Sequence, residues 1–229
     1  MEQQLIRVEN LEKLYQDNGV PVRALHEVSL SIGRGEFSAI AGPSGSGKTT
    51  LLNLIGALDK PTQGTIYFEG EDLSSKSKKE LSSLRLHRLG FVFQAYNLIP
   101  VLTALENVEF AMMLLGIPDS ERIRRATAIM EELGIAELAH KRPNKMSGGQ
   151  QQRVAVARAI VTNPSVVLAD EPTANLDSTT AHGLIELMER MNKEKNITFI
   201  FSSHDQQVLE HARRILVLKD GTLVNEINK

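Results

Sequence analysis

Gly42-Pro-Ser-Gly-Ser-Gly-Lys-Thr-Thr50 is the stretch that decides the fold, because it matches the pattern G-x-x-x-x-G-K-[ST] at every fixed position. In such a loop, glycines let backbone N–H groups curl around phosphates, Lys48 reaches the β- and γ-phosphates, and the Thr49 hydroxyl ligates Mg²⁺. The flanking runs predict a strand over 37–41 and a helix over 49–58 whose N-terminus faces the anion. We therefore predict a phosphate-binding loop made of Gly42, Pro43, Ser44, Gly45, Ser46, Gly47, Lys48, Thr49 and Thr50.

Composition narrows the class of protein. The chain has 229 residues with 41% hydrophobic residues, enough for a sizeable core. Its formal net charge is −2 and its basic residues are dispersed, so we expect no nucleic-acid partner. It has no cysteine, which excludes disulfides and thiol chemistry and is typical of a cytoplasmic protein. The longest apolar run, Phe110–Leu115, is far shorter than the ~20 residues of a membrane helix, so we expect no direct membrane insertion.

Short β-branched runs alternate with helical patterns, which predicts an α/β domain with a largely parallel sheet. The predicted strands are 5–9, 28–32, 37–41, 65–68, 90–93, 166–169, 197–201 and 215–218. Between Ala95 and Pro164 we predict three helices, over 104–115, 120–133 and 148–161, and no strand. The charged run Ser74–Lys79 is predicted to be a solvated loop. We expect a single domain, 1–229, with a core of 1–94 and 165–229 and an inserted helical subdomain at about 95–164.

A predicted strand at Ser165–Ala169 ends in two carboxylates, Asp170 and Glu171. An α/β sheet places ligand chemistry at the carboxyl ends of its strands. Phosphoryl transfer needs both a metal-binding carboxylate and a group that positions water. We predict that Asp170 holds Mg²⁺, usually through water, and that Glu171 orients and deprotonates the attacking water. The alternative is a pair of acidic residues that cap a helix.

Met146-Ser-Gly-Gly-Gln-Gln-Gln-Arg153 is the second informative motif. Ser147 can cap a helix whose first turn, Gly148, Gly149 and Gln150, offers backbone N–H groups to a phosphate. This run resembles the signature of ABC-transporter ATPases, in which a leucine commonly stands where this chain has Met146. The resemblance implies that Ser147, Gly148, Gly149 and Gln150 contact ATP.

Other elements of that family follow in the expected order. Gln94, after the strand at 90–93, resembles the Q-loop glutamine, which contacts Mg²⁺ and the attacking water. Asp177 is similar to the D-loop aspartate that links two subunits, and His204 to the switch histidine that senses the γ-phosphate. Tyr15 resembles the A-loop aromatic that stacks on adenine. Each has a plainer alternative: a surface glutamine, a helix-capping aspartate, a structural histidine and a packing tyrosine.

The resemblance covers the whole chain and is finest over 94–108, 112–118 and 174–177, which look like the lipoprotein-release and macrolide-export branch of ABC ATPases. It implies an α/β fold of the P-loop NTPase (RecA-like) kind, with a mostly parallel sheet, an antiparallel β portion and an inserted α-helical subdomain. It also implies an ATP-hydrolysing motor subunit that binds a second copy of itself head to tail, with ATP and Mg²⁺ sandwiched between Gly42–Thr50 of one copy and Ser147–Gln150 of the other. It also implies integral membrane permease subunits, to which the chain attaches at the cytoplasmic face of the inner membrane. The alternative is a cell-division type of ABC ATPase, which drives a membrane partner without transporting a substrate.

The apolar segment Tyr96–Leu102 follows the predicted Q-loop glutamine. We predict that it contributes to a groove for a short cytoplasmic helix of the membrane partner, next to the residue that senses the nucleotide. The alternative is that it packs on the helical insertion.

Overall fold

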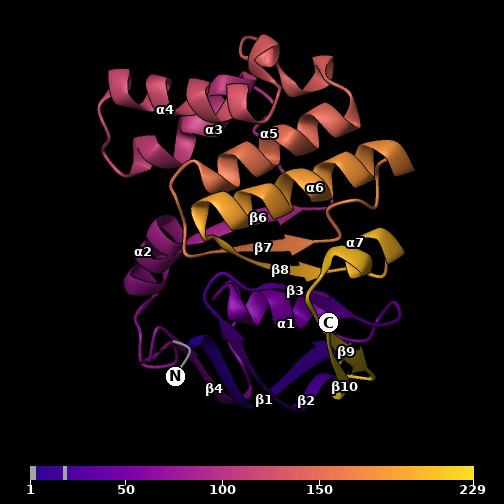
Figure 1. Ribbon diagram of the computed structural model, residues 1–229. Helices are drawn as coiled ribbons and strands as arrows, with labels where there is room; N and C mark the ends of the chain where they lie inside the picture. The colour runs from indigo at the N-terminus through magenta and orange to yellow at the C-terminus, as the bar shows by residue number, and fades with distance from the viewer. Residues whose placement is uncertain (1–3, 18–19) are drawn as a thin grey trace.

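The computed structural model describes residues 4–17 and 20–229, which form two sheets with helices around them (Figure 1). The smaller sheet has the strand order β2-β1-β4-β5, and every neighbouring pair in it is antiparallel. Its strands are β1 (Gln4–Asp17), β2 (Val20–Gly33), β4 (Gln63–Phe68) and β5 (Glu71–Asp72). This is the antiparallel portion that the family resemblance implies.

The larger sheet has the order β10-β9-β3-β8-β7-β6. Its strands are β3 (Phe37–Ala41), β6 (Leu89–Phe93), β7 (Val166–Asp170), β8 (Thr198–Ser202), β9 (Arg214–Lys219) and β10 (Thr222–Asn228). All neighbours are parallel except β9 and β10. The order is not the chain order, so strands far apart in the sequence lie side by side, and the predicted α/β class with a mostly parallel sheet is confirmed.

Helix α1 (Lys48–Ile55) lies between the two sheets (Figure 1). Its apolar residues pack in one core with the smaller sheet and with Ile40 of β3 and Ile200 of β8. Side chains alternate across a strand, so Phe37 of β3 and Phe199 of β8 point to the opposite face and enter the second core. The phosphate-binding loop, which joins β3 to α1, is therefore anchored on both sides by buried structure.

Helices cover that second face of the larger sheet (Figure 1). They are α3 (Ala104–Leu114), α4 (Asp119–Glu132), α5 (Gly148–Ile160) and α6 (Ser178–Lys195). The three helices predicted between residues 95 and 164 are α3, α4 and α5, each with ends within one residue of the prediction. Reciprocal capping boxes begin α3 at Thr103 and α5 at Ser147, which explains why these starts are visible in the sequence.

The prediction of a loop at Ser74–Lys79 is wrong for its last two residues, Lys78 and Lys79, which are helical. Ser77 caps α2 (Lys78–Arg88) through a capping box with Glu80. Lys78 and Lys79 lie exposed in the first turn of this helix. The pattern was missed because this helix buries one residue, Leu81, and so has no apolar stripe. The predictions also lack β5, β10, α6 and α7 (Gln206–His211). No helix in residues 4–17 and 20–229 is long and apolar enough to cross a membrane.

Candidate nucleotide site

Four neighbouring parallel strands end at one edge of the larger sheet, and each is followed by a polar residue that the sequence singled out. The phosphate-binding loop follows β3, Gln94 follows β6, Glu171 follows β7 and the segment with His204 follows β8. Parallel strands bring their carboxyl ends together, where an α/β sheet binds its ligands. The topology thus assembles residues separated by more than a hundred positions.

The phosphate-binding loop has a backbone that excludes larger side chains. Gly42 has φ 150°, and a Cβ there would lie 2.1 Å from the Leu218 carbonyl oxygen. Gly47 caps α1 with φ 100°, and its Cβ would lie 2.6 Å from the Ala24 carbonyl oxygen. Both glycines are therefore needed for the loop to curl at the N-terminus of α1, where backbone N–H groups and the helix dipole favour an anion.

Lys48 extends back along the loop and donates to the carbonyl oxygens of Gly42 (2.9 Å) and Pro43 (3.0 Å). The Ser46 hydroxyl is buried and has no hydrogen-bond partner among the described residues. Serine 46 is close enough to Gly42 that a Cβ on the glycine would meet its hydroxyl at 2.7 Å. A buried lysine and a spare hydroxyl inside a curled loop form a donor set that fits a phosphate.

Glu171 lies beside this lysine. Its carboxylate is 4.0 Å from the Lys48 ammonium and 2.9 Å from Nδ1 of His204. The backbone of Glu171 is left-handed, with φ 45°, and its N–H donates to the Ser202 carbonyl at 2.8 Å. Such strain in a non-glycine residue is typical of functional sites. Glu171 is not a helix cap, so the plainer alternative for this residue is wrong.

Oxygen donors suited to a divalent cation lie next to the loop. The Thr49 hydroxyl is 3.0 Å from Oδ1 of Asp170, the last residue of β7. Hydroxyl, carboxylate and amide oxygens are the ligands that Mg²⁺ takes, usually with water and phosphate oxygens completing its shell. With Gln94 at the same edge, these side chains fit a magnesium–nucleotide complex.

A cavity of about 480 Å³ occupies this edge. It is lined by nine predicted site residues: Ser44, Gly45, Gly47, Lys48, Thr49, Thr50, Gln94, Glu171 and His204. Gly42, Pro43 and Ser46 form the loop behind it, and Asp170 reaches it through Thr49. The volume is in the range of small-molecule and cofactor sites.

The remaining predicted residues lie outside the cavity wall. Ser147 caps α5 by accepting from the Gln150 N–H, so that N–H is used within the chain. Asp177 caps α6 and accepts from Thr180, which lowers the pKa of its carboxyl group. Gly148 and Gly149 stand against Tyr96 and Thr180. Tyr15 is exposed on β1, opposite Val22, a residue that lines the cavity.

Several residues at or near the nucleotide cavity are not predicted from the sequence. Val22, Arg23 and Ala24 on β2, and Ala174 after β7, also line the cavity. The fully buried Gln152 donates from α5 to the Pro172 carbonyl at 2.8 Å, directly after Glu171. A polar residue at a buried position of an apolar helix face is the signal that could have identified Gln152.

The loop after Gln94 is held by two side chains. Asn175 donates to the Gln94 carbonyl at 2.9 Å. Arg158, near the end of α5, donates to the carbonyl of Asn97 and, at 2.8 Å, to that of Tyr96. Tyr96 and Asn97 are both left-handed, with φ 62° and 49°, so the arginine holds a backbone turn that is unfavourable by itself.

The fold and site define a class of protein: an α/β P-loop nucleoside triphosphatase, with metal-binding oxygens and a carboxylate–histidine pair at one sheet edge. Comparison with known proteins identifies the family. The model of the ABC transporter family matches residues 25–174. The ABC transporter ATP-binding protein YtrE of Bacillus subtilis is 46% identical over 208 residues, which cover 91% of this chain and 89% of that protein.

Two further relatives extend the comparison. The macrolide export ATP-binding/permease protein MacB of Brucella melitensis is 43% identical over 98% of this chain, which spans 35% of that longer protein. The cassette MJ0796, from Methanocaldococcus jannaschii, was solved as a post-hydrolysis dimer bound to ADP and Pi. That structure has a TM-score of 0.91 and 42% identity, and the match covers 97% of this chain and 98% of that one.

The chain therefore belongs to the ABC transporter family. It is the subunit of such a transporter that binds and hydrolyses ATP.

Proposed function

We propose that this ATPase drives a separate membrane permease of the lipoprotein-release or macrolide-export kind. The observation that carries the chemistry is the convergence of Lys48, Asp170 and Glu171 at one sheet edge, with the contacts Thr49–Asp170 and Glu171–His204. The similarity to MacB, whose name joins ATP binding to a permease, supports the choice of branch. We further propose that 1–94 with 165–229 acts as the core and about 95–164 as a helical subdomain.

Each residue has a role in this proposal. Lys48 and the loop N–H groups of Gly42–Thr50 bind the phosphates, and Thr49, Gln94 and Asp170 would hold Mg²⁺. The cation, when bound, offsets negative charge on the phosphates. Glu171 accepts the proton of the attacking water, and His204, through its hydrogen bond to Glu171, keeps the carboxylate turned toward the γ-phosphate position.

We propose that two copies act together. Ser147–Gln150 and Asp177 lie outside the cavity of their own chain, so they are available to the nucleotide of a second copy. The N-terminus of α5 presents a helix dipole that favours phosphate. The solved dimer of the MJ0796 cassette with ADP and Pi supports the pairing of two copies. Loss of the bridging γ-phosphate would then favour opening of the dimer.

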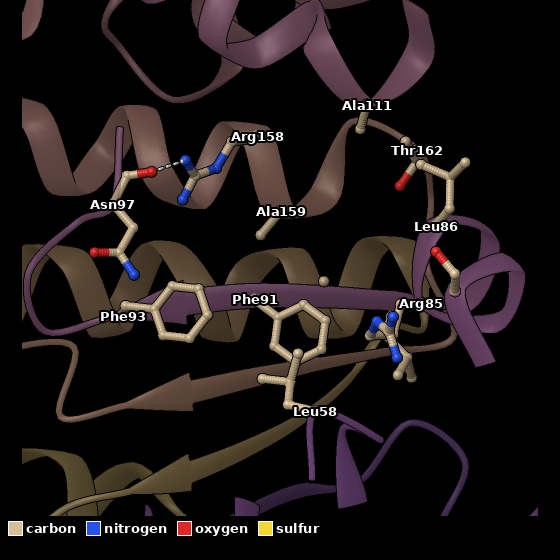
Figure 2. A pocket seen from close by; sticks show the side chains of 13 residues that line it. Leu58, Arg85, Leu86, Phe91, Phe93, Asn97, Ala111, Arg158, Ala159 and Thr162 are labelled. Atoms are coloured by element: carbon tan, nitrogen blue, oxygen red, sulfur yellow. Dashed lines mark hydrogen bonds between the residues drawn. The ribbon is translucent and has the colours of Figure 1, made fainter. Parts of the chain in front are cut away.

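The surface proposed for the membrane partner is a groove of about 380 Å³ beside β6, the edge strand of the larger sheet (Figure 2). Its lining includes Leu58, Leu86, Phe91 and Phe93, and the two phenylalanine rings stack at 5.9 Å between centroids. We propose that a short cytoplasmic helix of the permease inserts its apolar face here, which places the ATPase at the cytoplasmic face of the inner membrane.

This groove is connected to the nucleotide site. Figure 2 shows Arg158 bonded to the Asn97 carbonyl at the wall of the groove, and the same turn follows Gln94. Movement of the groove wall would therefore reach the site through one backbone turn. By contrast, Leu98 is packed against the main core, which supports the packing alternative for that side chain.

The substitution Glu171→Gln tests the proposed role of Glu171 as the base that accepts the proton of the attacking water. We expect ATP binding to persist while hydrolysis falls by about 10²–10⁴-fold, because a general base contributes that much. ATP should then hold the variant as a dimer on size exclusion. The matched control, Glu131→Gln, changes an exposed residue of α4 and should hydrolyse ATP at the wild-type rate. Wild-type turnover in Glu171→Gln would remove this residue from the mechanism.

A further inference from the structure

Tyr15 is tied to the helix that begins at the phosphate-binding loop. Its hydroxyl donates to Oδ2 of Asp59 at 2.8 Å. Asp59 follows the end of α1, and Thr50 lies in its first turn. The tyrosine on β1 is thus fixed relative to the segment that follows α1, the helix whose N-terminus positions the phosphates.

Lys13 contacts both Asp59 and the ring of Tyr15. Its side chain is nearly buried, and its ammonium donates to Oδ1 of Asp59 at 2.8 Å and to the Lys60 carbonyl at 2.7 Å. It also lies 4.7 Å from the centroid of the Tyr15 ring. Residues 13 and 15 share one face of β1, so the strand itself brings the cation against the aromatic face.

The other part of the ring remains available. Tyr15 is 39% exposed and pairs across the hairpin with Val22, which lines the nucleotide cavity together with Thr50. A ring with one face against a cation and an exposed remainder beside the cavity can accept a base by stacking.

The protonation states agree with this network. Partial burial and the Asp59 carboxylate raise the pKa of Tyr15, so its hydroxyl remains a donor at neutral pH. Burial acts to raise the pKa of Asp59, but the hydrogen bonds from Lys13, the Lys60 N–H and Tyr15 outweigh it and lower that pKa. Asp59 is therefore an anion that accepts from all three groups.

We propose that Lys13 and Asp59 are positioning residues for the nucleobase: they set the place of the Tyr15 ring relative to the phosphate loop and so determine how strongly the site prefers ATP to a bare triphosphate. This inference rests on the adenine-stacking role that the family resemblance implies for Tyr15. The competing explanation is that the pair only fastens β1 to the segment after α1. A structural fastener would affect every ligand of the site, whereas a base-positioning pair affects only ligands that carry a base.

The experiment compares dissociation constants for ATP and for inorganic tripolyphosphate, measured by calorimetry on the full chain. Lys13→Met and Asp59→Asn should each weaken ATP binding by about 3–30-fold, the range of a cation–π contact. Tripolyphosphate binding should stay at the wild-type value, and KM for ATP should rise while kcat is unchanged. Lys60→Met is the matched control, because only the backbone of Lys60 joins the network and its side chain is exposed.

Tyr15→Phe and Tyr15→Leu separate the two levels of the proposal. The phenylalanine variant keeps the ring but loses the bond to Asp59, and since Tyr15 is exposed it tests the network without disturbing the core. It should show part of the ATP-specific loss. If Tyr15→Leu leaves ATP affinity unchanged, the stacking role of Tyr15 is wrong. The positioning role is overturned if Tyr15→Leu weakens ATP binding but Lys13→Met, Asp59→Asn and Tyr15→Phe do not. It is also overturned if these three variants weaken the binding of tripolyphosphate as much as that of ATP.

Discussion

Replacing Arg158 by methionine tests whether one partly buried guanidinium holds the turn after Gln94. The variant loses two hydrogen bonds, to the carbonyls of Tyr96 and Asn97, while methionine retains much of the apolar stem. Without these bonds the two left-handed residues have no charged donor to hold them, and we expect the turn to relax. Gln94 would then keep the bond from Asn175 to its carbonyl but lose the fixed turn that follows it, and its side chain would be displaced at the cavity.

The size of the effect follows from the contacts. Hydrogen bonds from a charged donor contribute about 1.5–3 kcal/mol each. Burial lowers the pKa of Arg158 because removing the charged guanidinium from water is unfavourable. The methionine variant has no charge and does not pay this desolvation cost, which offsets part of the loss. We therefore expect a net loss of about 2–3 kcal/mol in the free energy of unfolding. For a domain of this size that corresponds to a fall in Tm of about 4–12 °C.

Scanning calorimetry measures the stability change, and steady-state kinetics measures its consequence. We expect kcat to fall by about 10–100-fold through misplacement of Gln94, with KM for ATP unchanged because the phosphate loop is intact. The control is Arg190→Met, since Arg190 is exposed and makes a bond to the Glu132 carbonyl at the surface; it should cost no more than about 0.5 kcal/mol. If Arg158→Met keeps the wild-type Tm and kcat, the reasoning about this turn is refuted.

Two further predictions concern the partners. Lys48→Ala and Ser147→Arg should each abolish ATPase activity. A mixture of the two variants should regain part of the activity, because one composite site of a head-to-tail dimer then carries neither substitution. Crosslinks that join positions 48 and 147 within one chain would contradict this arrangement. Leu58→Asp, at a residue of the groove that is 47% exposed, should leave ATP binding and Tm near wild type while removing association with the membrane fraction, and unchanged association would exclude the groove as the docking site.

The sequence by itself determined the elements whose signals are local. The phosphate loop needs glycines at Gly42 and Gly47 because of its backbone, and Ser147 with Gln150 forms a capping box within one turn. These features depend on residues a few positions apart, so their patterns can be recognised without the fold. The buried strands β3 and β7 were equally plain, since an apolar run between polar ends has few alternatives.

Only the tertiary structure decided which polar groups meet. The strand order places β8 between β3 and β7, and that order alone brings His204 within 2.9 Å of Glu171. The clamp of Lys13 and Asp59 on Tyr15, and the hold of Arg158 on the turn after Gln94, join segments about 44 to 62 residues apart. No local pattern encodes these contacts, because a side chain's partner is set by how sheets and helices pack. Helix α2 shows a different limit: Ser77 and Glu80 carry a local capping signal, but the helix buries only Leu81 and has no apolar stripe to mark it as a helix.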